Sequence, residues 1–311
     1  MAYESALAMG LVPYVAGEQP KSTRKLIKLN TNENPYPPSP KVEEALRGKA
    51  ESLRLYPDME ATALREAIAK VHGVRPEQVF CGNGSDEVLA FSFAAFFAGK
   101  KLVTPDITYS FYPVYSQLFG VNYTTVPLRE DYTVDVDGLM QGCPIALADP
   151  NAPTGIDLPT SELRRLAEHT RAAGEVLLVD EAYAAFAEED AIGLLKDFDN
   201  VLIVRTFSKS WALAGMRIGF AMGDEKLIAS LRKVRDSFNS YPTDRLAQAA
   251  AEAAVLDTAY TEKTVALVKT ARDRCYQALK AAGITVLPSA TNFLFVKADE
   301  EDAQRVRLAL K

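Results

Sequence analysis

The chain has 311 residues, of which 48% are hydrophobic and 24% are charged, and its formal net charge is −6. This composition is ordinary for a soluble globular enzyme, and the length allows one large domain or about two of average size. No block of like charges stands out, which argues against nucleic acid as a partner.

The cysteines and the apolar segments indicate where in the cell the protein is expected. Cys81, Cys143 and Cys275 are far apart and form no C-x-x-C pair, so neither a disulfide framework nor a metal site is predicted. The N-terminus lacks the basic and apolar regions of a signal peptide. The longest apolar stretch, residues 88–99, is shorter than the roughly 20 residues that span a bilayer. We therefore expect a cytoplasmic protein with no membrane partner and a buried helix at 88–99.

The first part of the chain is rich in turn-forming residues. Residues 30–40 hold several prolines, which remove backbone donors and exclude a helix. They predict an N-terminal arm. A helix is expected near 41–50 and, after a break at 55–58, apolar residues at helical spacing predict another over 60–71.

Beyond these helices, short apolar strands alternate with further helices. Strands are expected at residues 79–81, 102–104, 123–126, 145–148, 176–179, 201–204, 218–221, 284–287 and 293–296. Helices are expected after a cap at Ser85, at 110–119, 161–173, 224–239 and 245–282 (the last in two pieces), and at the end of the chain. Uninterrupted runs of β-branched and other apolar residues between helices indicate parallel strands that are buried on both faces.

These elements predict an α/β fold with a large domain and a small one. The large domain, residues 41–245, is expected to hold a mostly parallel sheet flanked by helices. Residues 1–40 would form the arm and part of a small α+β domain, which residues 246–311 would continue.

Asp180 is the first candidate site residue. It follows four apolar residues and so lies at the carboxyl end of a buried strand, the edge where open α/β sheets bind ligands. A buried carboxylate is costly unless it is paired, and a pyridinium nitrogen would be a fitting partner. A helix cap, a structural ion pair and the carboxylate of an ATPase are the alternatives, although the ATPase reading lacks a phosphate loop.

Lys209 lies in the loop after the strand at 201–204. Its amine suits imine formation with an aldehyde. Ser208 offers a hydroxyl nearby, and Arg217 offers a guanidinium that can bind a phosphate with two donors. A solvated surface lysine is the alternative.

Other groups fit around an aromatic ligand that carries a phosphate. The turn at 82–87 opens a helix and makes an anion site; as a dinucleotide fingerprint it is incomplete. Asn151 could donate to a phenolate oxygen, as could Tyr183, and Tyr109 could stack on a ring. A Pro-Asn turn and core packing are the alternatives for Asn151 and Tyr109. The isolated histidines, His72 and His169, are interpreted as surface or packing residues.

Taken together, these motifs resemble those of the fold-type I pyridoxal phosphate (PLP) aminotransferases, and among them most resemble the histidinol-phosphate aminotransferases. The resemblance runs from about residue 11 to 296. It is carried by Asn30-Thr-Asn-Glu-Asn-Pro-Tyr36, Leu55-Tyr-Pro-Asp58, Gly82-Asn-Gly-Ser-Asp-Glu87, Asp149-Pro-Asn-Ala-Pro-Thr-Gly155, Val179-Asp-Glu-Ala-Tyr183, Arg205-Thr-Phe-Ser-Lys-Ser210 and Ala214-Gly-Met-Arg217.

The resemblance implies a role for each candidate residue. Lys209 would hold PLP as a Schiff base and then move the proton between the substrate Cα and the cofactor C4′. Asp180 would pair with the pyridine nitrogen, and Tyr183 with Asn151 would bind the phenolate oxygen. The remaining roles are ring stacking by Tyr109, phosphate binding by Ser85, Asp86, Ser208 and Arg217, a phosphate contact to the neighbouring subunit of a homodimer by Tyr56, and substrate covering by Tyr14 and Asn32.

One part of the family pattern is missing. Members carry a further stretch after the strand at 293–296, with an arginine that binds the substrate anion, and we find no counterpart up to Lys311. Either the printed residues are part of a longer chain, with the C-terminal domain incomplete, or anion recognition differs here.

The predicted reaction is transamination of histidinol phosphate with 2-oxoglutarate, giving imidazole acetol phosphate and glutamate, a step of histidine biosynthesis. The alternatives on the same fold are a threonine-phosphate decarboxylase and an aminotransferase for aromatic or other amino acids. From other classes, a nucleotide-binding ATPase or dehydrogenase and a non-catalytic PLP-binding protein stay open.

Overall fold

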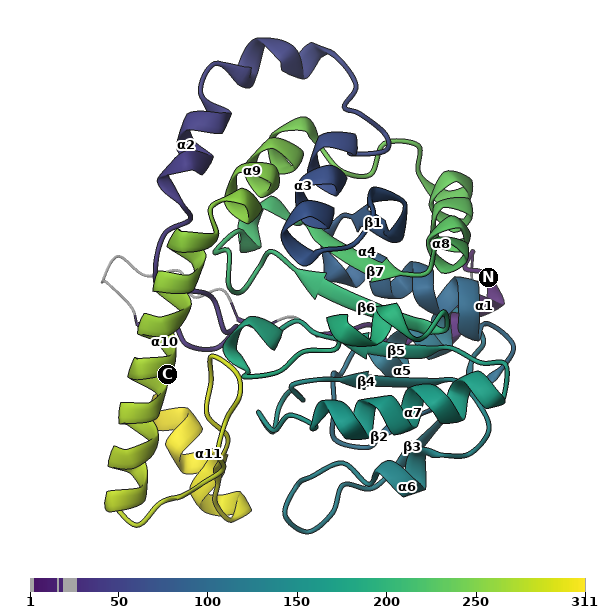
Figure 1. Cartoon of the computed structure of the whole chain (residues 1–311). Coiled ribbons are helices and arrows are strands. Elements are labelled where there is room, and N and C mark those ends of the chain that lie inside the picture. Colours follow the sequence, from purple (N-terminus) through teal and green to yellow (C-terminus); the bar gives the residue numbers. More distant parts are fainter. Residues whose placement is uncertain (1–2, 16, 19–26, 311) are drawn as a thin grey trace.

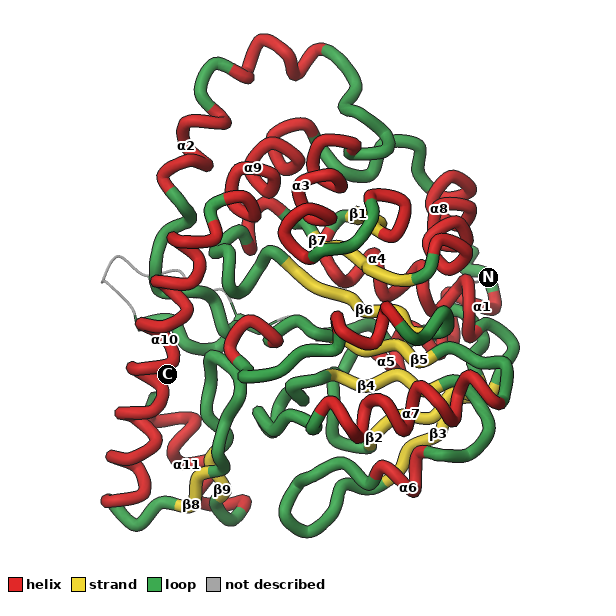
Figure 2. Tube along the Cα trace, in the orientation of Figure 1, coloured by secondary structure: helices red, strands yellow, loops and turns green. Residues whose placement is uncertain are grey.

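The computed structural model describes residues 3–15, 17–18 and 27–310. Part of the predicted arm, residues 1–2, 16 and 19–26, lies outside the described residues. The described chain forms a central seven-stranded sheet in the order β1-β7-β6-β5-β4-β2-β3 (Figures 1 and 2). Its strands are β1 (Val79–Gly82), β2 (Lys101–Pro105), β3 (Asn122–Val126), β4 (Ile145–Ala148), β5 (Leu177–Asp180), β6 (Val201–Thr206) and β7 (Gly219–Gly223).

Strand direction confirms the predicted α/β class. Five neighbouring strands of the sheet, β3, β2, β4, β5 and β6, run parallel. Strand β7 is antiparallel to both of its neighbours, β1 and β6. All residues of β4, β5 and β6 are buried, as expected of parallel strands that are covered on both faces.

Helices cover both faces of this sheet (Figure 1). The helices are α1 (Ala6–Gly10), α2 (Pro40–Leu46), α3 (Thr62–His72), α4 (Gly84–Ser92), α5 (Tyr112–Leu118), α6 (Val136–Leu139), α7 (Thr160–Ala172), α8 (Glu225–Phe238), α9 (Arg245–Leu256), α10 (Thr258–Ala281) and α11 (Glu300–Ala309). Side chains of α3, α7 and α9 share one hydrophobic cluster with the sheet, and side chains of α4, α5 and α8 share another.

Alternation along the strands explains the two clusters. In β5, Leu177 and Val179 belong to the first cluster and Leu178 to the second, because successive strand residues point to opposite faces. By the same alternation Asp180 points to the face that α5 covers, which fixes the side on which its partners lie.

Three of the predicted boundaries concern helices, and one of these predictions was wrong. Ser85 does not cap α4, because the helix begins at Gly84 after Asn83, so Ser85 lies in its first turn. The predicted break within 245–282 is confirmed at Asp257 between α9 and α10. The apolar stretch predicted as a helix over 88–99 is helical as far as Phe97, with a π-helical turn at Phe93–Phe97.

The long helix α10 runs along one side of the molecule (Figure 1) and contacts β8 (Thr285–Val286), which pairs with β9 (Val296–Lys297) in a second sheet (Figure 2). Tyr260 Oη donates to the Pro37 carbonyl at 2.9 Å, so α10 contacts the N-terminal segment. The division into domains at 41 and 245 stays a prediction.

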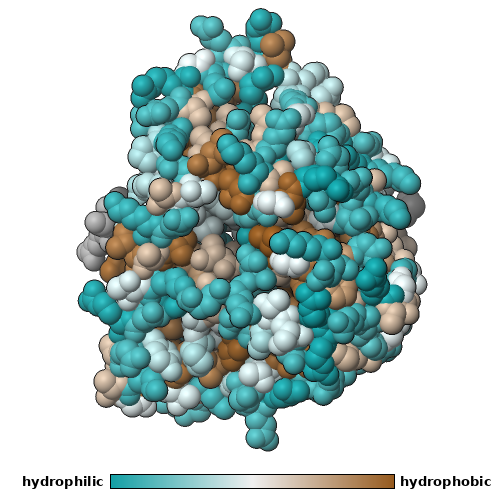
Figure 3. All heavy atoms as spheres, in the orientation of Figure 1, coloured by the Kyte–Doolittle hydropathy of each residue, from teal (hydrophilic) through white to brown (hydrophobic). Residues whose placement is uncertain are grey.

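The surface shown in Figure 3 is mostly hydrophilic, and its apolar residues form small separate groups. None of the helices in the described ranges combines the length and the apolar character that crossing a bilayer requires.

Candidate active site

A cavity of about 530 Å³ lies outside the carboxyl ends of the central strands. The last residues of β4, β5 and β6, which are Ala148, Asp180 and Thr206, border it, at the edge where open α/β sheets bind ligands. The cavity brings together most of the predicted site residues. These are Tyr14, Ser85, Asp86, Tyr109, Asp180, Tyr183, Ser208, Lys209 and Arg217.

Asp180 is a buried acid, with 4% of its surface exposed. Tyr112 Oη donates to its Oδ2 at 3.2 Å, and the Ala182 N–H donates to its Oδ1 at 3.3 Å. Both donors are uncharged, and burial raises the pKa of Asp180 to about 7. A protonated ring nitrogen in the cavity would supply the missing cation and compensate the cost of burying the carboxylate.

Lys209 lies in the loop after β6 and faces the same cavity. Its Nζ donates to the Thr31 carbonyl at 2.8 Å and lies 5.5 Å from the centre of the Tyr183 ring. Burial lowers the pKa of Lys209 to about 8, although the charges of Glu33 and Asp86 oppose this shift. More of this amine is therefore neutral at physiological pH than of an ordinary lysine, as attack on an aldehyde requires.

The backbone approaches very closely where α4 begins beside β7. A Cβ on Gly219 would lie 2.3 Å from the Ser85 nitrogen, and one on Gly84 would lie 2.6 Å from Arg217 Nη2. Glycine is required at both positions, because the neighbour of Gly219 is backbone and Gly84 has a φ of +83°. These approaches leave the first N–H groups of α4, at the positive end of the helix dipole, available to an anion.

Side chains complete this anion-binding corner. Arg217 Nη2 lies 3.0 Å from Asp86 Oδ2, and Arg217 Nη1 lies 3.5 Å from the hydroxyl oxygen of Ser208. Ser85 lines the cavity beside them. A guanidinium, two hydroxyl groups and a helix N-terminus form a donor set that suits a phosphate. The Asp86 carboxylate pairs with the arginine and positions its guanidinium, while the Asp86 N–H belongs to the first turn of α4.

Two tyrosines flank the space between Asp180 and the anion-binding corner. Tyr109 Oη donates to Asp86 Oδ1 at 2.8 Å, which holds its ring at the cavity wall. Tyr183 Oη accepts a hydrogen bond from Asn32 Nδ2 at 3.1 Å. This hydrogen bond joins two predicted site residues that lie 151 positions apart in the chain.

Asn151 differs from the other predicted residues, because its amide is used within the chain. Its Nδ2 donates to the Ile107 carbonyl and to Thr154 Oγ1, both at 3.0 Å, and its Oδ1 accepts from Thr108 Oγ1 at 2.9 Å. Asn151 is not among the residues that line the cavity. Donation to a ligand oxygen would require one of these hydrogen bonds to be exchanged.

The described part of the N-terminal arm borders the cavity, which Tyr14 and Gly17 line. The Tyr14 ring stacks on Phe111 at 4.3 Å between centroids. Gln117 on α5 holds the arm at two points, since its Oε1 accepts from the Val12 N–H at 2.9 Å and its Nε2 donates to the Gly10 carbonyl. This contact could not be predicted, because a single glutamine on a helix has no distinctive sequence pattern.

Tyr56 lies away from the cavity and is 77% exposed. Its ring stacks on Tyr241 with 4.6 Å between centroids, and its carbonyl accepts a hydrogen bond from Arg245 Nη2 at 2.6 Å. The side chain therefore points to the surface of its own chain.

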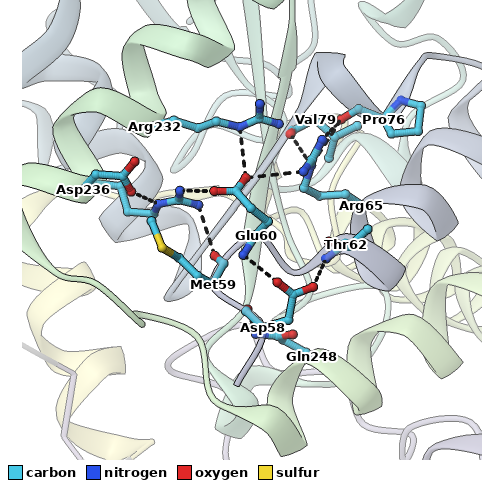
Figure 4. A network of polar contacts seen from close by, with 11 residues as sticks. Asp58, Met59, Glu60, Thr62, Arg65, Pro76, Val79, Arg232, Asp236 and Gln248 are labelled. Carbon is cyan, nitrogen blue, oxygen red and sulfur yellow. Dashed lines mark hydrogen bonds and ion pairs between the residues drawn. The ribbon is translucent and has the colours of Figure 1, made fainter. Parts of the chain in front are cut away.

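A polar network holds the segment that carries Tyr56 (Figure 4). Glu60 lies between three arginines: its Oε2 is 3.4 Å from Arg65 Nη1 and 3.4 Å from Arg232 Nε, and its Oε1 pairs with Arg235. Asp58 accepts from the Thr62 N–H at 2.8 Å. These contacts fix the backbone at 58–60 against α3 and α8.

Both histidines behave as packing or surface residues, as predicted. His72 stacks on Phe220 at 5.7 Å, and burial lowers its pKa to about 4. His169 accepts a hydrogen bond from the Gly142 N–H at 3.0 Å. Among the described residues no cluster of His, Cys, Asp and Glu is arranged to hold a metal ion.

Comparison with known proteins gives one family match and many close relatives. The family model described as "Aminotransferase class I and II" matches residues 24–310. A histidinol-phosphate aminotransferase of Acetobacter pasteurianus is 49% identical over 310 residues, which are 99% of this chain and 86% of the relative. Histidinol-phosphate aminotransferase 1 of Burkholderia pseudomallei is 48% identical over 316 residues, with 99% of this chain and 88% of the relative covered.

Solved structures show the same fold. The histidinol-phosphate aminotransferase of Sinorhizobium meliloti, in complex with pyridoxal-5'-phosphate, superposes with a TM-score of 0.87 at 29% identity and covers 99% of this chain and 85% of its own. A mutant aspartate aminotransferase of Thermus thermophilus has a TM-score of 0.85 at 23% identity, with 100% and 90% covered.

Proposed function

Because the chain belongs to the aminotransferase class I and II family, we propose that it transfers the amino group of histidinol phosphate to 2-oxoglutarate with PLP as cofactor. The products are imidazole acetol phosphate and glutamate. The observation that carries the proposal is the buried Asp180, which accepts from two neutral donors within the described residues and borders the same cavity as Lys209 and the anion-binding corner.

The residues fit the cofactor at three points. Asp180 would hold the ring nitrogen and Lys209 would bind the aldehyde. The phosphate would be held by Ser85, Asp86, Ser208 and Arg217. The bound cofactor supplies an electron sink for the substrate carbanion. Since the Asp180 carboxylate favours a proton on the ring nitrogen, it maintains that sink.

Lys209 also serves as the proposed base. Once its Nζ is free, it would take the proton from the substrate Cα, a task that suits an amine whose pKa burial has lowered to about 8. The Thr31 carbonyl, 2.8 Å from Nζ, would hold the free amine in position for this proton transfer.

The remaining site residues orient cofactor and substrate. Tyr109 would stack on the ring, and Tyr183 would bind the phenolate oxygen together with Asn151, if Asn151 exchanges a loop hydrogen bond. Tyr14 and Asn32 would cover the substrate and exclude water.

We further propose a homodimer in which Tyr56 contacts the phosphate in the partner's site. The exposure of Tyr56, its neighbours Tyr241, Leu53 and Leu55 on the surface, and the rigid support from the Glu60 network favour this arrangement. Free thiols at Cys81, Cys143 and Cys275 suit the proposed cytoplasmic location.

The test is an absorption spectrum of the protein loaded with PLP, before and after addition of histidinol phosphate. We expect the visible band of the lysine-bound cofactor to disappear and 2-oxoglutarate to restore it, with imidazole acetol phosphate identified by mass spectrometry. A band that does not respond to any amino donor would favour a non-catalytic PLP-binding protein. Release of CO₂ from threonine phosphate would instead indicate the decarboxylase, and absence of PLP binding would refute the proposal.

A further inference from the structure

Tyr112 is the residue in contact with Asp180 that the sequence patterns did not single out. It begins α5, is 0% exposed, and donates from its Oη to Asp180 Oδ2 at 3.2 Å. Because Asp180 points to the face covered by α5, this helix is the element that can reach the acid from below the cavity. The hydroxyl thus contacts a proposed cofactor-binding group without lining the cavity itself.

Packing holds the phenol ring in one place. The ring stacks on Phe93 with 5.9 Å between centroids and an interplanar angle of 29°, and it meets the Tyr109 ring edge-on at 5.7 Å. The Tyr112 N–H donates to the Tyr109 carbonyl at 3.2 Å. Side chain and backbone are therefore both fixed, so the direction of the hydroxyl is set by the fold.

The hydroxyl is a donor to the carboxylate at physiological pH. Burial, followed by the charge of Asp180, raises the pKa of Tyr112 well above its ordinary value, so the phenol keeps its proton there. Since the Ala182 N–H takes the other carboxylate oxygen, both oxygens are oriented before a ligand arrives. A neutral donor orients the carboxylate and leaves its negative charge available to a ligand, whereas an arginine would neutralise that charge.

We propose that Tyr112 is a positioning residue, which holds Asp180 as an oriented carboxylate for the ring nitrogen of PLP. This inference rests on the proposed function. It predicts that the Tyr112 hydroxyl strengthens the interaction with the ring nitrogen specifically and contributes little to the binding of the phosphate or the aldehyde.

The experiment compares two ligands on the apo-protein: PLP and its 1-deaza analogue, in which a C–H group replaces the ring nitrogen. The wild type should bind PLP about a hundredfold more tightly, as expected for pairing of a buried charge. Tyr112→Phe should weaken PLP binding about tenfold, the effect of one hydrogen bond to a charged group, and leave the analogue almost unchanged. The ratio of the two dissociation constants should therefore fall about tenfold.

Tyr115→Phe is the matched control. Tyr115 lies on the same helix, is 5% exposed, and its hydroxyl has no hydrogen-bond partner among the described residues. Its removal should leave the ratio at the wild-type value. Tyr112→Leu also lacks the hydroxyl and should give the same lowered ratio, which protects the test against poor folding of the phenylalanine variant.

The ratio separates positioning from simple support of the fold, because partial unfolding weakens both ligands equally. Equal losses for PLP and its analogue, or an unchanged ratio in both Tyr112 variants, would overturn the role assigned to Tyr112. Failure of the wild type to bind PLP would instead refute the proposed function.

Discussion

Asp180 and Glu181 are adjacent buried acids whose surroundings differ completely. Glu181 pairs with Arg205 at 2.7 Å and accepts from the Ala191 N–H at 2.5 Å, and Arg205 also pairs with Asp190 at 2.8 Å. Asp180 has a phenol and one backbone N–H as donors and faces the cavity. The chain satisfies one acid with its own cation and leaves the other for a ligand.

The difference separates a residue that serves stability from one that serves function. Removing one partner of a buried ion pair strongly destabilises a protein, because the other charge stays buried and unpaired. An acid without a cation costs free energy in the apo-protein, and a cationic ligand recovers that cost on binding.

The largest effect is expected for Asp180→Asn. The variant should lose about a hundredfold or more in affinity for PLP, because the ring nitrogen loses its charged partner, while the folded apo-protein should be retained. Titration of the apo-protein with PLP by fluorescence measures this. Wild-type affinity in the variant would show that the ring nitrogen does not face residue 180.

Glu181→Gln should give the opposite pattern. Its free energy of unfolding should fall by about 3 kcal/mol, because Arg205 stays buried with its charge only partly compensated. PLP affinity of the folded variant should match the wild type. Urea denaturation measures the first quantity, and a loss of cofactor affinity without a loss of stability would contradict the contrast between the two acids.

The pH dependence of apo-protein stability sharpens the comparison further. Burial raises the pKa of Asp180 from 3.8 to about 7, so between pH 4 and 7 the folded state binds more protons at this group than the unfolded state does. The wild type therefore loses stability as pH rises through this range. Asp180→Asn should gain stability relative to the wild type from pH 4 to 7 and show no further relative change above it. A difference that does not vary with pH in thermal unfolding would count against the assignment.

The smallest effect is expected at the mouth of the cavity, where neutral hydrogen bonds hold the arm. Gln117→Ala releases two such bonds, each of which contributes about 1 kcal/mol. KM for histidinol phosphate should rise up to about tenfold, while PLP affinity stays at the wild-type value. Steady-state kinetics measure the effect, and Gln141→Ala is the control. The side chain of Gln141 makes its hydrogen bonds with Lys101 and Gly138 and not with the arm.

Local patterns were sufficient to predict the strand ends and the residues that follow them. Asp180 comes directly after one uninterrupted apolar run, and Lys209 lies in the loop that follows another. Parallel strands bring such positions to one edge of a sheet. The contacts of Tyr112 and Gln117 could not be predicted. Their partners lie 68 positions away for Tyr112 and at least 105 positions away for Gln117, and both contacts depend on which face of α5 meets the sheet. The prediction of Ser85 as a helix cap was wrong because α4 begins one residue earlier, at Gly84, and Asn83 is its N-cap residue.

The most direct test of the account is reduction of the PLP-loaded protein with borohydride, followed by proteolysis and mass spectrometry. If Lys209 binds the aldehyde of PLP, the peptide that carries Lys209 should bear a pyridoxyl phosphate group, and the corresponding peptide of Lys209→Ala should not. A modification on another lysine in the wild type, or none at all, would contradict it.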